Sequence, residues 1–174
     1  MRQLTDVQRL QRFVKAVAAE TSARTHVYFT GGASAVLVGW RATTVDVDIK
    51  MVPERGEILR AIPRLKESLE INVELASPGD FIPELADWES RSVFIADDGS
   101  VSFYHYDFYA QCLAKIERGH TRDAEDVREM MARGLVEPER LLRFYGEIES
   151  GLYRYPAIDP PSFRRAVEEM IKPR

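Results

Sequence analysis

The sequence predicts an α/β (α+β) fold, in which a small mixed sheet is flanked by helices and followed by a C-terminal helical part. Over about the first 107 residues, short runs with strand-like alternation take turns with segments of helical period. Beyond that point only helical patterns remain, separated by glycine and proline. We therefore expect an α/β core over residues 1–107 and a helical part, packed on it, over residues 108–174.

The first half of the chain predicts the order α-β-α-β-α-β. Leu10, Phe13 and Val17 give the first helix its apolar stripe, Gly39 closes the second helix, and Pro53 ends the second strand. The expected elements are a helix over 5–22, a strand over 25–30, a helix over 33–38, a strand over 45–52, a helix over 55–69 and a strand over 70–76.

The second half begins with a hairpin signal and then becomes helical. Two strands, over 91–96 and 100–106, are joined by the turn sequence Asp97-Asp98-Gly99. Glycines and prolines then separate four expected helices, over 108–118, 121–133, 138–150 and 162–171.

Composition excludes several classes of protein. The chain has no apolar run near the roughly 18–20 residues of a membrane span, and its amphipathic start differs from a signal peptide. Cys112 is the only cysteine, which excludes an intrachain disulfide and a cysteine-based metal cluster. A net charge of −4 argues against a non-specific nucleic-acid coat but allows a local basic cleft. We expect a cytoplasmic protein without a membrane partner.

Asp46 and Asp48 are the strongest candidates for chemistry. Side chains two apart on a strand share a face, so these carboxylates lie side by side while Val47 and Ile49 point into a core. Two adjacent carboxylates repel each other unless a cation lies between them, and oxygen ligands suit Mg²⁺. The alternative is an exposed strand with an acidic outer face, although aspartate is disfavoured in strands.

A glycine turn lies just upstream of the aspartates. Gly31, Gly32 and Ser34 follow a strand and open a helix, a place where backbone N–H groups and a hydroxyl can bind phosphate. The alternative is a tight strand-to-helix connection, which often uses glycine. Together, the turn and the aspartates predict metal-assisted chemistry on a nucleotide.

Three further positions are candidates whose ordinary explanations stay open. Glu74 would approach the metal site if its strand neighbours the aspartate strand; otherwise it lies on a solvated face. Asp123 and Asp126 lie on or beside the apolar side of their helix, and a buried acid needs a partner. They serve either in catalysis or in structural pairs with the nearby cations Lys115, Arg118 and Arg122.

The chain resembles the DNA-polymerase-β-type nucleotidyltransferase superfamily. The resemblance is carried by the glycine pair followed, after 13 residues, by Asp-x-Asp between apolar residues. The block AKIERGHTRDAEDV is similar to the Lys…Arg-Asp-x-x-Asp segment of the AbiEii-like toxin branch and its small relatives. Relatives often carry Arg-x-Ser/Thr-x-Asp before the pair, whereas Arg41 is one residue farther out.

The resemblance implies a nucleotidyltransferase fold and a set of roles. Asp46, Asp48 and Glu74 would hold Mg²⁺, and Glu74 would alternatively deprotonate the acceptor. Lys115 would contact the nucleotide, although its place at a core edge also fits an ordinary snorkelling lysine, and Asp123 or Asp126 would fill the late acidic position.

The expected reaction is transfer of a nucleotidyl group from an NTP to an acceptor hydroxyl. A toxin acting on RNA such as tRNA, neutralised by an antitoxin protein, is what the resemblance to the toxin branch implies. Two alternatives stay open: a nucleotidyltransferase that modifies a protein or small molecule, and a non-catalytic nucleotide-binding or protein-interaction module.

Overall fold

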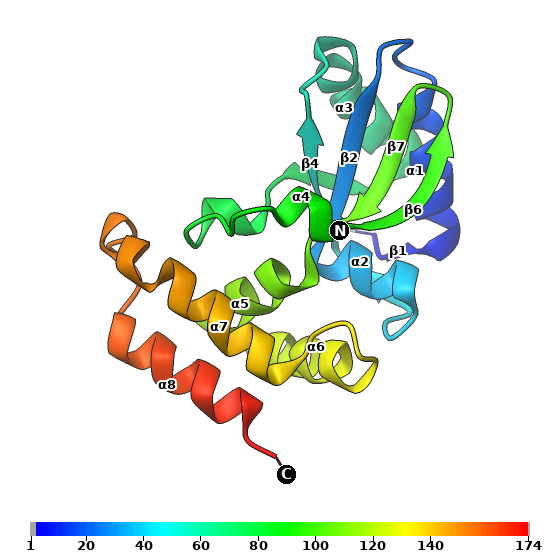
Figure 1. Cartoon of the computed structure of the whole chain (residues 1–174). Coiled ribbons are helices and arrows are strands. Elements are labelled where there is room, and N and C mark those ends of the chain that lie inside the picture. Colours follow the sequence, from blue (N-terminus) through cyan, green and yellow to red (C-terminus); the bar gives the residue numbers. More distant parts are fainter. Residues whose placement is uncertain (1–2, 174) are drawn as a thin grey trace. The chain divides into compact units, whose positions relative to one another are not determined.

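The computed structural model describes residues 3–173 and divides the chain into two compact units. The first unit contains the residues up to Ser77 together with Ser92–Tyr106, and the second contains Pro78–Arg91 with Asp107–Arg174. The predicted α/β architecture with a mixed sheet is confirmed (Figure 1). The chain passes from the first unit to the second for the last time between Tyr106 and Asp107, and Pro78–Arg91 groups with the C-terminal helices. The expected domain division at residue 107 stays a prediction.

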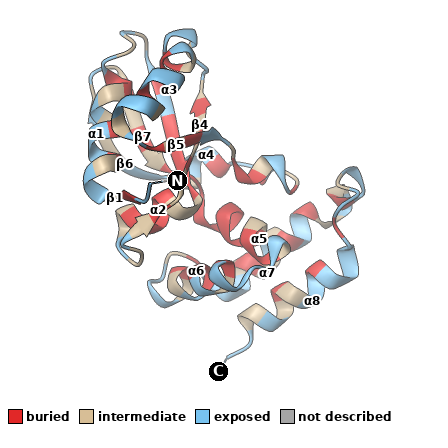
Figure 2. Cartoon of the chain, turned by 180° about the vertical axis from the view of Figure 1, so that it is seen from behind, coloured by how far each residue is buried: buried red, intermediate tan, exposed pale blue. Residues whose placement is uncertain are grey.

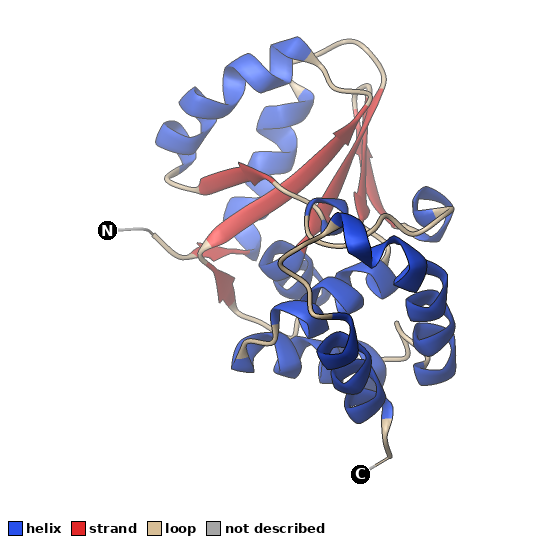
Figure 3. Ribbon diagram, turned by 90° about the vertical axis from the view of Figure 1, so that its left-hand side faces the viewer, coloured by secondary structure: helices blue, strands red, loops and turns tan. Residues whose placement is uncertain are grey.

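The first unit is built on a five-stranded mixed sheet in the order β5-β4-β2-β7-β6, drawn in red in Figure 3. β2 runs antiparallel to β4 and parallel to β7, whereas β4 runs parallel to β5. The strands are β2 (Thr25–Thr30), β4 (Asp46–Val52), β5 (Asn72–Leu75), β6 (Val93–Asp98) and β7 (Val101–His105).

The core of this unit lies between one face of the sheet and its helices. α1 (Val7–Ala18) and α3 (Gly56–Leu69) contribute Leu10, Phe13, Ile58 and other apolar residues to a cluster with the sheet. Along β4, Val47, Ile49 and Met51 are buried and alternate with the half-buried Asp46, Asp48 and Lys50, as the period of two requires. The aspartates therefore occupy the face opposite to this core.

The N-terminal helix differs from the prediction at its start. Residues 5–22 were expected to be helical, but β1 (Thr5–Asp6) pairs antiparallel with β3 (Thr43–Thr44) in a separate two-stranded sheet. The Asp6 carboxylate then accepts a hydrogen bond of 2.9 Å from the Arg9 N–H, which caps α1 and sets its first residue at Val7.

Several other boundaries differ from the expected ones, mostly by one or two residues. α2 (Gly31–Val38) begins at Gly31 rather than at residue 33. Glu70 adopts a left-handed conformation as the C-cap of α3, so β5 starts only at Asn72. The hairpin strand β6 continues to Asp98, which moves the turn to Gly99 and Ser100.

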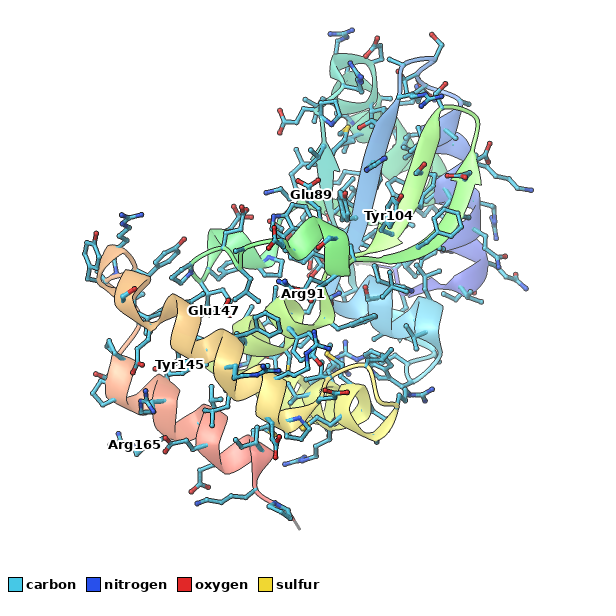
Figure 4. The ribbon with its side chains drawn as sticks, in the orientation of Figure 1. Glu89, Arg91, Tyr104, Tyr145, Glu147 and Arg165 are labelled. Carbon is cyan, nitrogen blue, oxygen red and sulfur yellow. The ribbon has the colours of Figure 1, made fainter. Side chains whose placement is uncertain are left out.

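The second unit is helical, as predicted. Its long helices are α5 (Phe108–Arg118), α6 (Thr121–Ala132), α7 (Pro138–Ile148) and α8 (Pro160–Ile171). α5 is buried along most of its length and contacts each of the other three (Figure 2). Tyr145, labelled on α7 in Figure 4, packs edge-on against Phe163 of α8 at a ring-centroid distance of 5.0 Å. Short elements not predicted are η1 (Pro78–Asp80), α4 (Trp88–Arg91) and η2 (Glu149–Arg154).

Among residues 3–173, every helix is too short or too polar to cross a lipid bilayer.

Candidate active site

The sheet register brings the predicted acidic residues to one place in the first unit. Asp48 on β4 lies opposite Thr30 on β2, the residue directly before the glycine turn. On its other side Asp48 lies opposite Glu74 on β5, and Asp46 lies opposite Asn72. Opposite residues in paired strands have neighbouring side chains. Glu74 therefore neighbours the aspartate strand, which was the condition for its candidacy.

The glycine turn and Asp48 are in direct proximity. Gly31 has φ +61°, a left-handed conformation that favours glycine, and a Cβ at this position would lie 3.2 Å from Asp48 Oδ2. The Asp48 carboxylate therefore lies against the first residue of α2. A ligand phosphate at this helix N-terminus would be adjacent to the carboxylate pair.

Glycine is required at position 32 because Thr44 of β3 lies very close to this residue. A Cβ on Gly32 would overlap the Thr44 hydroxyl and lie 2.8 Å from Thr44 Cβ. The Thr44 hydroxyl in turn donates a hydrogen bond of 3.0 Å to the Asp46 carbonyl. Thr44 thus connects the start of α2 to the aspartate strand, and this contact depends on the missing side chain at residue 32.

Replacing Gly32 by Ala is expected to destabilise the protein by about 3 kcal/mol, since overpacking of a rigid contact typically costs ~1–3 kcal/mol. Chemical denaturation would measure the free energy of unfolding. Gly146→Ala is the matched control, because nothing lies within 4 Å of a Cβ built there on α7. An equal effect of the two substitutions would contradict the packing role of Gly32.

Arg41 is a residue near this site that the sequence analysis did not select. Its Nη1 would lie 3.4 Å from a Cβ on Gly32, so the guanidinium reaches the first turn of α2. A guanidinium matches phosphate geometry and keeps its charge at any physiological pH. The position of Arg41 shortly before the Asp-x-Asp pair was the available signal, although its spacing differs from that of the relatives.

Ser34 lies at the buried base of the turn. Its side chain has no exposed surface, and its hydroxyl donates to the Phe29 carbonyl at 3.1 Å. His105 Nδ1 lies 3.0 Å from the same hydroxyl. Since the hydroxyl proton is used on Phe29, Nδ1 of the neutral imidazole must be the donor. Ser34 thus joins β2, α2 and β7, and its phosphate contact remains a prediction.

Burial of His105 predicts a loss of stability in acid. Desolvation lowers the pKa of His105 from 6.5 to about 4, so the unfolded chain binds a proton over a pH range in which the folded protein does not. Stability should therefore fall by about 3 kcal/mol as the pH decreases from about 6.5 to about 4. Denaturation curves of the wild type and His105→Asn, measured across this range, should converge at low pH. Parallel curves would contradict the assignment.

Asn72 is a second contributor that the sequence analysis did not select. Its amide nitrogen donates to Asp46 Oδ1 at 2.6 Å and to Glu74 Oε1 at 3.1 Å. The amide therefore lies between two of the three carboxylates that were predicted to bind the metal. An asparagine two residues before Glu74 carried no signal by itself, because only the register with β4 brings it to Asp46.

The carboxylates at this site could bind a cation that prefers oxygen ligands, but fewer than three of them converge on one point. Within residues 3–173, no three His, Cys, Asp or Glu side chains converge closely enough to hold a metal ion. Asp46 and Asp48 share a face beside the glycine turn, and Mg²⁺ commonly takes one or two carboxylates, completing its shell with phosphate and water. The arrangement fits two aspartate ligands, while Glu74 as a third remains a prediction.

In the second unit, Lys115 forms a buried ion-pair network with Asp123 and Asp126. Lys115 Nζ lies 2.7 Å from Asp126 Oδ2 and 3.5 Å from Asp123 Oδ1. Arg118 donates to both Asp123 oxygens, at 2.8 and 2.5 Å. The side chains of Lys115 and both aspartates are buried. This network corresponds to the structural pairing that the sequence analysis kept as the alternative to catalysis.

The charges in this network are balanced by their neighbours. Burial raises the pKa of Asp123, but hydrogen bonds from Arg118 and the charges of Lys115 and Arg118 outweigh burial and hold the pKa below its ordinary value. Asp123 is therefore ionised at neutral pH. A carboxylate held in this state favours an ion-pair role over service as a general acid.

Cys112 and Asp107 are two further buried ionisable groups in this unit. Burial raises the pKa of the Cys112 thiol, so it stays protonated and unreactive. Burial also raises the pKa of Asp107, against the opposing effect of Arg91, which donates to its Oδ2 at 2.8 Å. Asp107 caps α5 by accepting from the Tyr109 N–H at 3.1 Å. Arg91, labelled in Figure 4, also lies 4.3 Å from the centre of the Phe144 ring.

The fold and the glycine–aspartate site together define a protein of the nucleotidyltransferase class. The sequence comparison agrees: the chain belongs to the family DUF6036, described as a nucleotidyltransferase of unknown function, which matches residues 6–165. The match covers both units. No curated protein and no solved structure gives a significant match to this chain.

Proposed function

We propose that the protein is a Mg²⁺-dependent nucleotidyltransferase that moves a nucleotidyl group from an NTP to an acceptor hydroxyl. The observation that supports this most is the position of Asp48, whose carboxylate lies against Gly31 at the start of α2. Phosphate binding at the helix start and cation binding at the aspartates would then occur at adjacent points. Membership of a nucleotidyltransferase family supports the same reaction class.

Each group at the turn has a definite task in this proposal. Asp46 and Asp48 would hold Mg²⁺, which when bound offsets negative charge on the reacting phosphate and on the leaving pyrophosphate. The backbone N–H groups of Gly31 and Gly32 would bind phosphate oxygens, and Arg41 would add a permanent positive charge at the same turn. Fixed charges of this kind need no reorganisation during the reaction.

Glu74 is assigned to the acceptor side of the site. Its side chain is exposed and lies opposite Asp48 in the register. One of its oxygens accepts from Asn72, which leaves the other to take the proton of an acceptor hydroxyl. This base role needs no third protein ligand on the metal.

The roles of Lys115, Asp123 and Asp126 follow from the resemblance. Lys115 Nζ donates to Asp126 and lies within ion-pair distance of Asp123. We propose that the ammonium contacts the nucleotide, as the resemblance implies, with Asp126 and Asp123 orienting it. The two aspartates then act through Lys115 rather than on the substrate.

For the acceptor, we propose RNA, with tRNA as the first choice. The support is the resemblance of AKIERGHTRDAEDV to the AbiEii-like toxin branch, which also points to a cytoplasmic toxin paired with an antitoxin protein. The net charge of −4 restricts RNA contact to a local basic surface.

A labelling experiment tests the function directly. The protein is incubated with Mg²⁺ and each NTP, labelled at the α- or the γ-phosphate, with and without total tRNA. We expect α-label, and no γ-label, to appear on RNA and to vanish with EDTA. Label on the protein or a small molecule would retain the reaction but overturn the RNA acceptor. The absence of α-label transfer with every NTP and acceptor would overturn the proposed function.

A further inference from the structure

We propose that Asn72 is a positioning residue of the reaction, holding Asp46 and Glu74 in their working orientations before any cation binds. This inference rests on the proposed function, because it gives the two carboxylates the roles described above. Asn72 is the only asparagine in the chain, which also makes its amide accessible to selective measurement.

The register explains how one amide reaches both carboxylates. Asn72 lies opposite Asp46 on the neighbouring parallel strand and two residues before Glu74 on its own strand. The three side chains therefore share a face of the sheet. The amide nitrogen lies 2.6 Å from Asp46 Oδ1 and 3.1 Å from Glu74 Oε1, and an NH₂ group has one hydrogen for each.

The chemistry of the contact fixes the orientation of the amide. With the opposite rotation, the amide oxygen would face two carboxylate oxygens, and none of the three groups would have a hydrogen to donate. Only the NH₂ orientation satisfies both acids. Direct contact between the two carboxylates would be repulsive. Asn72 is a neutral donor that lies between them and holds both in place.

The contact involves one oxygen of each carboxylate. The amide donates to Oδ1 of Asp46 and to Oε1 of Glu74. The amide keeps Glu74 next to the aspartates without making it a third ligand of the metal. This agrees with the absence, in the described part of the chain, of a cluster of three metal-binding side chains.

Loss of the amide should weaken cation binding, because groups that orient a metal ligand typically contribute about 10–100-fold to affinity. Titration with Mn²⁺, followed by electron paramagnetic resonance, should show binding to Asn72→Ala that is about 10–100-fold weaker than binding to the wild type. The transfer rate of the variant should recover at high Mg²⁺, with a fold that is unchanged by circular dichroism. Ser102→Ala is the matched control, since it removes another sheet hydrogen bond to a carboxylate, that of Asp97. Wild-type Mn²⁺ affinity in Asn72→Ala would overturn the proposal.

A second measurement is independent of activity. In protein labelled with ¹⁵N-asparagine, the single side-chain NH₂ resonance pair should shift when Mg²⁺ is added, and the shift should be lost in Asp46→Ala, which keeps Asn72 as the only asparagine. An NH₂ signal that stays constant as Mg²⁺ saturates its site would overturn the role of Asn72.

The two measurements separate the inference from the proposed function. If Asp46→Asn abolishes Mn²⁺ binding and Asn72→Ala leaves it unchanged, only the positioning role fails. If Asp46→Asn binds Mn²⁺ as tightly as the wild type, the metal site itself fails, and the proposed function and the role of Asn72 fail with it.

Discussion

Replacing Asp46 or Asp48 by Asn is expected to reduce nucleotidyl transfer at least about a thousandfold, equivalent to about 4 kcal/mol of transition-state stabilisation. Each substitution keeps the size of the side chain and removes the charge that holds Mg²⁺ beside the glycine turn. The initial rate of α-label transfer is the measurement. Both residues are half-buried on the face of the sheet opposite to the core, so the free energy of unfolding should change little.

The control for this prediction is another aspartate of the same sheet. Asp97 on β6 is exposed and accepts a hydrogen bond from Ser102. Asp97→Asn should retain wild-type activity. Full activity of both Asp46→Asn and Asp48→Asn would show that neither carboxylate serves the reaction, whereas loss of activity with unfolding would point to a structural role.

Elements with clear local signals at both ends were predictable from the sequence. β2 (Thr25–Thr30) and α5 (Phe108–Arg118) have the predicted bounds. Local sequence signals mark both ends of each element, and the residues between them follow a single pattern. β1 and β3 were missed for the opposite reason. A strand of two residues has no period, and Thr5–Asp6 finds its partner only about 40 residues away.

The site was predictable where it depends on local spacing. Alternation along β4 puts Asp46 and Asp48 on one face in the absence of any tertiary information. Contacts across strands were not accessible in this way. The amide of Asn72, the guanidinium of Arg41 and the burial of Ser34 each depend on which elements become neighbours, which the sequence pattern does not specify.

The block around Lys115 carries the sequence resemblance, and its charged residues also pair with one another inside the second unit. Lys115 contacts both Asp123 and Asp126. These ion pairs predict a stabilising role for Lys115 in addition to its proposed contact with the nucleotide.

Replacing Lys115 by Met is expected to lower the free energy of unfolding by about 3–5 kcal/mol, the usual cost of removing one partner of a buried ion pair. Methionine keeps the apolar stem but removes the cation nearest to the buried Asp126 carboxylate. Chemical denaturation is the measurement, with Arg118→Met as the control. The Arg118 side chain is 56% exposed, and Asp123 keeps its contact with Lys115 in that variant, so the control should lose less stability. Wild-type stability of Lys115→Met would show that its contacts with Asp123 and Asp126 contribute little to the fold.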